Sequence, residues 1–447
     1  MKKIKSTLLL FLGMSLVCVT SFSNEKNTLK SFIEEALQNS PYLKLQEKNV
    51  NAKDADVQIA RANFFPHVQG EFTRDRQSDE NYFTDFQKKR FEESSDTSVQ
   101  SINTKLDQDI VAWAVDVKQD IFKGFGNVNN YREKKRIYDI SVVEQKIEKN
   151  NLIYDITSTY IDLLNLSSQL SFLQKALKSA LEQEKHAKRK YELQTISEAE
   201  LLKAQEKSLE ISWKLHEAKQ TNEISKNKLN QLLGKPLDQE IEPEPLKLKT
   251  AQPKSLSDYL KEAEQNLDLQ RAQLKLKKNR HKKQLTYAQH LLMPNLGFNF
   301  NYEQRGKKMT DLKDGWKFGA SLKVPLFDGL ENFGEKNKAQ AGIEAALVEE
   351  NLLHQKTHVE IKQHYYAWQS LEQKLQFLNK KRQRQQKRYD DVIKSYKEKA
   401  ATLAQLHAIE VLVQEVETEL LTTKRMQFLN ILALQKLTGE IYVQNLF

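Results

Sequence analysis

Two histidines, His354 and His358, lie four residues apart in a stretch rich in Ala, Glu, Lys and Gln. On a helix this spacing places both rings on one face, which is the arrangement of two-histidine metal sites. The intervening residues are Gln355, Lys356 and Thr357, so the Glu that serves as general base in zinc proteases is missing. We therefore interpret the pair as part of a solvated helix and predict neither a metal nor a cofactor.

The sequence offers no recognisable arrangement for catalysis. It contains no Gly-rich loop to cradle a phosphate, no Ser/His/Asp set on a plausible scaffold and no paired carboxylates in a predicted pocket. A catalytic nucleophile needs a base beside it, and none can be assigned. The sequence therefore predicts that the protein is not an enzyme.

Aromatic side chains in short apolar segments are the other candidates for ligand binding. They are Trp113, Phe298, Phe300, Trp316 and Phe318. A platform that stacks a ligand and a surface that faces lipid both explain their spacing. We favour the lipid-facing surface, because membrane strands carry aromatic residues on that side.

The candidate residues are predicted to lie on or between long helices. The 447 residues are 39% hydrophobic and 29% charged, with only 13 Gly and 8 Pro, which is typical of long helices joined by few loops. A stretch without Pro or Gly over residues 127–191 predicts a rod of about 90 Å. The aromatic residues on its apolar stripe, and on that of its second-half counterpart, are predicted to pack; they are Tyr160, Tyr365 and Trp368. Other helices are predicted over residues 28–62 with a break at Ser40-Pro41, over residues 198–233, and from Leu256 to Pro294.

Four segments alternate apolar and polar residues and are predicted to be strands with one apolar face. They lie near residues 68–72, 110–122, 296–302 and 316–326. A long polar loop is predicted between the first two strands, over residues 74–106, and a short loop between the last two.

The N-terminus predicts export from the cytoplasm. Lys2, Lys3 and Lys5 precede an apolar run over residues 8–19, so we predict a signal peptide over residues 1–23 that contains the only cysteine, Cys18. No later segment is apolar enough for a transmembrane helix. The net charge of +10 comes from 70 basic and 60 acidic residues that are interspersed, which indicates a solvated surface and no nucleic-acid partner.

The chain is internally duplicated. Phe122 and Gly124 match Phe327 and Gly329 at an offset of 205 (327 − 122), and the same offset relates the apolar stripes of the two halves. A constant offset over such a length indicates a repeat. We therefore predict a first repeat over residues 24–235, a Pro-rich linker over 236–254 and a second repeat over 255–447.

Four such strands fit a bilayer if they are tilted. An open sheet would leave two unpaired edges in lipid, so closure requires strands from other copies. Two copies would give a barrel of about eight strands that side chains fill, whereas three would give about twelve and an open lumen.

Two motifs make a family resemblance specific. The joint between strand and helix reads Pro-Leu-Phe-Asp-Gly over residues 325–329, with a degraded copy, Asp-Ile-Phe-Lys-Gly, over residues 120–124. Each predicted hairpin tip has a Tyr followed six residues later by Ser or Thr. In these features the chain resembles the TolC-like outer membrane efflux proteins of Gram-negative bacteria over essentially its whole mature length.

The resemblance implies a mainly helical protomer with a membrane β-barrel. Three protomers would form a twelve-stranded barrel in the outer membrane, continuous with a tunnel of long antiparallel helical hairpins in the periplasm. Such a trimer would be the passive exit duct of a tripartite efflux pump or a type I secretion system. Its implied partners are a periplasmic adaptor, an inner-membrane transporter and outer membrane lipid.

The resemblance also implies a site for gating and adaptor docking at the hairpin tips, made of Tyr191, Ser197, Glu200, Leu201, Tyr396, Thr402, Gln405 and Leu406. Ser197 and Thr402 could equally cap the returning helices, and the two roles are compatible. The family's common Gly three residues after the Tyr is replaced by Gln194 and Lys399. Gln405 and Ala408 stand where some members carry aspartates, so a cation-binding acidic ring is not expected.

Two alternatives to this duct are a protein of another class and a duct with another cargo. A periplasmic coiled-coil scaffold or adaptor would keep the strands in a soluble sandwich and would need no detergent. A duct for metal ions would need Met, His or Cys along its lumen, which five Met and no mature Cys do not support. The sequence does not indicate a substrate.

Overall fold

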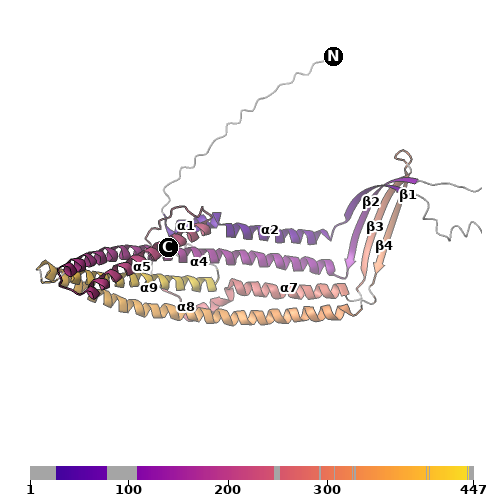
Figure 1. Cartoon of the computed structure of the whole chain (residues 1–447). Coiled ribbons are helices and arrows are strands. Elements are labelled where there is room, and N and C mark those ends of the chain that lie inside the picture. Colours follow the sequence, from indigo (N-terminus) through magenta and orange to yellow (C-terminus); the bar gives the residue numbers. More distant parts are fainter. Residues whose placement is uncertain are drawn as a thin grey trace, which may run out of the picture.

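The computed structural model describes residues 27–77, 108–245, 252–290, 293–306, 308–324, 326, 329–398, 400–401, 403–439 and 441. The chain forms a long helical rod with a sheet at one end and two hairpin tips at the other (Figure 1). The predicted signal peptide, Cys18 and nearly all of the predicted long polar loop lie outside the described residues.

The sheet has four antiparallel strands in the order β1-β2-β3-β4. Their register aligns Gly70 with Val115, Val115 with Tyr302, and Tyr302 with Trp316. Residues directly opposite each other share a face, so the predicted apolar positions of all four strands gather on one side. The strands are β1 (His67–Gln77), β2 (Gln108–Lys123), β3 (Asn295–Gly306) and β4 (Lys313–Lys323).

The two faces of the sheet differ in chemistry. The apolar face is open, and Phe318, which stacks on Phe298 with ring centroids 5.8 Å apart, is 62% exposed. The other face carries charged and amide side chains, and Asn301 Nδ2 donates to Asp116 Oδ1 at 3.1 Å. Among the residues that the structure describes, the outer strands, β1 and β4, each pair on one side only.

The helices confirm a mainly helical protomer. The two longest, α4 and α8, have 67 residues each and begin 205 residues apart (331 − 126). α4 with α5, and α8 with α9, form two antiparallel hairpins (Figure 1). The helices are α1 (Leu29–Asn39), α2 (Pro41–Ala62), α4 (Gly126–Glu192), α5 (Glu198–Leu233), α6 (Leu256–Glu262), η1 (Ala263–Gln265), α7 (Leu267–His290), α8 (Glu331–Lys397) and α9 (Leu403–Leu437).

The helices are arranged as a curved wall with two long edges. In the half near the sheet, α2 packs on α4, α4 on α7, and α7 on α8; toward the tips, α5 packs on α4, α4 on α9, and α9 on α8. One edge is therefore α8 along its whole length, in line with β4. The opposite edge is α2 and then α5, in line with β1.

One helix differs from expectation. The helix predicted to run unbroken from Leu256 to Pro294 is interrupted at Asn266, whose φ of −56° and ψ of 128° leave the helical region. Asn266 Oδ1 accepts a hydrogen bond from the Leu269 N–H at 3.0 Å and so caps α7. Ser40 has nearly the same dihedral angles between α1 and α2, where Pro41 marked the break in the sequence.

The main core lies where α1, α4, α5 and α9 meet. Tyr160 is buried there, as predicted, and its hydroxyl donates to the Glu244 carbonyl at 2.6 Å. Burial, together with the nearby Glu244 carboxylate, raises the pKa of Tyr160 to about 12. Tyr365 packs against a second cluster, around Ile361 of α8.

Candidate functional site at the hairpin tips

The first tip is a short turn between α4 and α5. Tyr191 is exposed in the last turn of α4, and its carbonyl accepts from the Gln194 N–H at 2.8 Å. The Thr195 N–H and hydroxyl both donate to the Lys190 carbonyl, at 2.9 and 2.8 Å. Backbone and side-chain groups of the turn therefore donate hydrogen bonds to carbonyl groups at the C-terminal end of α4, which have no partner within the helix.

Ser197 caps the helix that returns from this tip. Its backbone is extended, with φ −78° and ψ 161°, and its Oγ accepts from the Glu200 N–H at 3.3 Å. The predicted capping role is confirmed. The exposed carboxylates of Glu198 and Glu200 lie in the first turn of α5, where their negative charge interacts favourably with the positive end of the helix dipole. Leu201 is half-buried behind them.

Gln194 is strained within this turn, because its φ of 55° lies in the left-handed region. We expect Gln194→Gly to stabilise the hairpin by about 1 kcal/mol, since Gly adopts this conformation without the steric cost of a Cβ atom. Urea unfolding of the purified protein, followed by circular dichroism, measures the change. Gln194→Ala keeps the Cβ and serves as the control. A Gly variant no more stable than the Ala variant would contradict the expectation.

The second tip joins α8 to α9. Tyr396 is exposed near the end of α8, and the Ala400 and Ala401 N–H groups both donate to the Ser395 carbonyl, at 2.8 and 3.1 Å. In the first turn of α9, Gln405 is exposed and Leu406 is half-buried. The predicted site residue Thr402 and its neighbour Lys399 lie outside the described residues. The other seven predicted site residues thus lie at the two tips, at one end of the rod (Figure 1).

Charged side chains tie α8 to α9 in the second hairpin. Glu419 of α9 pairs with Lys374 and Lys381 of α8 at 3.1 and 3.6 Å. Hydrogen bonding to Lys374, opposed by partial burial, lowers the pKa of Glu419. Arg382 pairs with Glu417 in the same hairpin. Below its tip, the α8–α9 hairpin thus combines an apolar seam with ion pairs at its margin.

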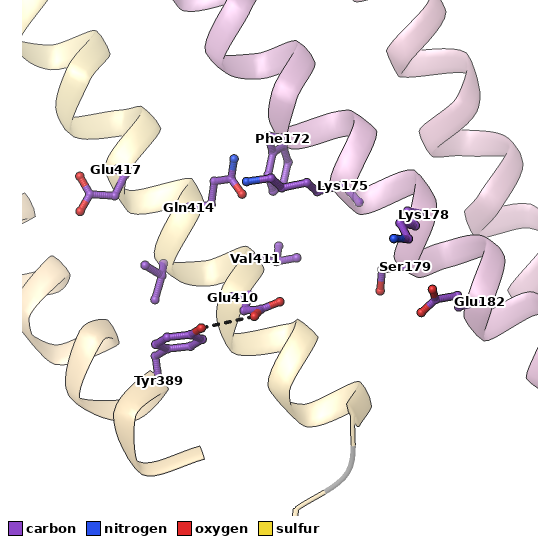
Figure 2. Close-up of a pocket in the computed structure, with 12 residues that line it drawn as sticks. Phe172, Lys175, Lys178, Ser179, Glu182, Tyr389, Glu410, Val411, Gln414 and Glu417 are labelled. Carbon is purple, nitrogen blue, oxygen red and sulfur yellow. Dashed lines mark hydrogen bonds between the residues drawn. The ribbon is translucent and has the colours of Figure 1, made fainter. Parts of the chain in front are cut away.

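Between the hairpins lies an open groove of about 660 Å³. Figure 2 shows Phe172, Lys175 and Lys178 of α4 on one wall. Glu410 of α9 and Tyr389 of α8 lie on the other wall and are joined by a hydrogen bond of 3.4 Å. The sequence did not reveal this groove, because its walls come from three helices whose mutual packing no local pattern specifies.

A hydrogen bond between side chains joins the two hairpins where α4 packs on α9. Arg425 Nη1 of α9 donates to Asn165 Oδ1 of α4. Burial lowers the pKa of this Arg425 guanidinium. The contact spans the boundary between the two hairpins.

His354 and His358 lie on one face of α8, with ring centroids 4.3 Å apart. His354 Nε2 is 2.9 Å from Glu264 Oε1 of η1, and burial is the main cause of a lowered pKa of His358. In the described part of the chain, no group of three or more His, Cys, Asp or Glu is placed to hold a metal ion. Nor does any helix over these residues combine the length and the apolar character needed to cross a membrane.

Comparison with known proteins gives a consistent result. A family model described as "Outer membrane efflux protein" matches residues 32–235 and 259–440. No curated protein sequence matches significantly.

Several solved structures share the fold. The outer membrane protein VceC from Vibrio cholerae is 17% identical, with a TM-score of 0.71 over 93% of this chain and 97% of the other. The CmeC outer membrane channel of Campylobacter jejuni is 16% identical, with a TM-score of 0.72 over 93% and 88%. The MtrE outer membrane channel of Neisseria gonorrhoeae, in its open state, is 16% identical, with a TM-score of 0.69 over 94% of each chain.

Proposed function

Because the chain belongs to the outer membrane efflux protein family, we propose that three copies of it form the passive exit duct of a tripartite efflux pump or a type I secretion system. The protein is located in the outer membrane, and its helical part lies in the periplasm. The duct performs no chemistry of its own, and the energy for transport comes from an inner-membrane transporter.

The observation that carries the proposal is the pair of open edges on one protomer. β1 and β4 end an open sheet whose apolar face is exposed. Lipid does not tolerate unpaired backbone groups, so β4 of one copy must pair with β1 of the next until the ring closes. Three copies give about twelve strands, the smallest closed ring of this unit with an open lumen.

The length of the rod supports a role in transport across the periplasm. α4 and α8 have 67 residues each, which corresponds to roughly 100 Å, far longer than the membrane is thick. We propose that it carries the lumen through the periplasm to an adaptor, which docks at the tips. Gating is assigned to the eight predicted tip residues, with the hairpins closed until the adaptor spreads them.

We further propose that residues 24–235 and 255–447 are two copies of one structural repeat, joined by residues 236–254. The equal lengths of α4 and α8 support this division. So does the match of the family model to two separate stretches.

Conductance across planar bilayers, together with fractionation of membranes, tests the duct. We expect an oligomer in the outer-membrane fraction that conducts ions. Glu200→Ala and Gln405→Ala are expected to change conductance or adaptor binding, because both residues lie in the first turn of a helix that returns from a tip. If both properties stay unchanged, these two residues leave the proposed site. A water-soluble monomer that needs no detergent would contradict the duct itself.

A further inference from the structure

Two lysines from different helices share one aromatic ring near the sheet. Lys283 Nζ of α7 lies 5.5 Å from the centre of the Tyr287 ring, and Lys336 Nζ of α8 lies 5.3 Å from the centre of the same ring. Lys336 Nζ is also 5.5 Å from the centre of the Phe333 ring. The electron-rich faces of the rings attract both ammonium groups, which places two positive charges around one side chain.

Neither of these charges is neutralised by a carboxylate of the described chain. Over the described residues, Lys283 and Lys336 form no ion pair, and both side chains are half-buried. Lys283 Nζ donates to the neutral amide oxygen of Gln340 at 2.7 Å. The carboxylate of Glu335, one residue before Lys336, pairs instead with Lys338 at 3.1 Å. The cluster can therefore accept an anion from outside the chain through charge-assisted hydrogen bonds.

The cluster lies at the end of the rod that adjoins the sheet, where α7 ends and α8 begins (Figure 1). Lys336 follows the first residue of α8 by five positions (336 − 331), or about 7 Å along the helix, and Lys283 precedes the last residue of α7 by seven (290 − 283), or about 10 Å. The headgroup layer of a bilayer extends about 5–8 Å beyond the hydrocarbon core. A lysine placed just outside the core can extend its side chain so that the ammonium group lies among the headgroups.

Two apolar side chains beside the cluster indicate which surroundings it faces. Leu330 is 62% exposed and Phe333 is 59% exposed. In a water-filled lumen both would remain in contact with water, whereas acyl chains at the membrane boundary would cover them. Large apolar residues next to lysines are typical of protein surfaces that lie in the membrane interface.

We propose that Lys283 and Lys336 bind the phosphate group of an anionic phospholipid in the periplasmic leaflet of the outer membrane. Leu330 and Phe333 contact the acyl chains of the same lipid. Basic pockets between helices next to a membrane recognise anionic headgroups in this way. The inference rests on the duct proposed above, in which the sheet spans the membrane, and each copy in the ring would hold one lipid.

The first repeat carries no equivalent cluster in the part of the chain that the structure describes. The position that corresponds to Lys336 is Tyr131 (336 − 205), whose ring packs on Phe64 with centroids 6.3 Å apart. An uncharged aromatic pair thus stands where the second repeat has a cation. The proposed lipid site belongs to the second repeat alone.

Native mass spectrometry of the detergent-extracted oligomer tests the site by counting the lipids that it retains. The probes are dioleoylphosphatidylglycerol, which is anionic, and dioleoylphosphatidylcholine, which has the same acyl chains and no net charge. Lys283→Gln combined with Lys336→Gln removes both charges of the cluster. The matched control, Lys277→Gln combined with Lys338→Gln, removes one charge from each of the same two helices at exposed positions on other faces.

We expect the natural protein and the control to retain several-fold more phosphatidylglycerol than phosphatidylcholine, and the Lys283/Lys336 variant to lose this preference. Equal retention of the two lipids by the natural protein, or equal retention of phosphatidylglycerol by the two double variants, would overturn the site and leave the duct intact. If inorganic phosphate raised the denaturation temperature as much as phosphatidylglycerol does, the occupant would be a soluble phosphate and the lipid would be excluded. A natural protein that is a water-soluble monomer would instead overturn the duct.

Discussion

Phe318→Arg is expected to remove the oligomer from the outer membrane. Phe318 lies near the middle of β4, opposite Phe300 on the apolar face, and is exposed in the protomer. An Arg that faces lipid near the bilayer midplane costs about 2–4 kcal/mol per site, and a ring of three copies bears this cost three times. The measurement is the amount of oligomer that detergent extracts from the outer-membrane fraction.

Ser321→Arg is the matched control, because it adds the same side chain to the same strand on the polar face. Ser321 lies opposite Gly297, so the new side chain has room and points away from the apolar face. We expect close to normal amounts of oligomer. If both variants assembled equally well, the apolar face would not contact lipid and the membrane assignment of the strands would be wrong.

Gly124→Ala is expected to destabilise the protein by about 2–5 kcal/mol, the sum of a left-handed backbone and an overpacked site. Gly124 joins β2 to α4 with φ +53°, and a Cβ atom there would lie 2.5 Å from Met293 Cβ and 2.9 Å from the Ala288 carbonyl oxygen. The backbone oxygen cannot move aside without disturbing α7. Urea unfolding measured by circular dichroism gives the change in the free energy of unfolding.

The second repeat provides the control for this variant. Gly329 has the same role and a similar φ of +69°, but a Cβ atom there would meet nothing within 4 Å in the protomer. Gly329→Ala is therefore expected to cost only the strain of the left-handed backbone, about 1–2 kcal/mol. Equal losses for the two variants would show that crowding by α7 is not the cause at Gly124.

Local patterns in the sequence predicted the strands and most helices well. Alternation identified all four strands because each has one apolar and one polar face, although β4 begins and ends three residues earlier than expected. Pro and Gly marked the break at Pro41 and the end of α5 at Gly234. The second break was missed because Asn266 stops a helix by capping, and Asn is also common inside helices.

Only the local features of the site could be predicted from the sequence. Ser197 and its helix are close in sequence, so a local rule identified the cap correctly. The left-handed Gln194 was not expected, because side chains with a Cβ are rare in that conformation. The groove between Phe172 and Glu410 depends on how two hairpins pack, and a stripe of apolar residues does not specify which helix covers it.

The equal length of α4 and α8 constrains how this chain can change over generations. A deletion in one helix alone would leave its hairpin shorter than its neighbour and shift its apolar stripe out of register. A tolerated change in rod length must therefore alter all four helices of the two hairpins together. Steps of about seven residues would keep the apolar stripe of each helix on the same face. Insertions and deletions along the rod should accordingly be rare among descendants and, when found, occur as matched sets of four.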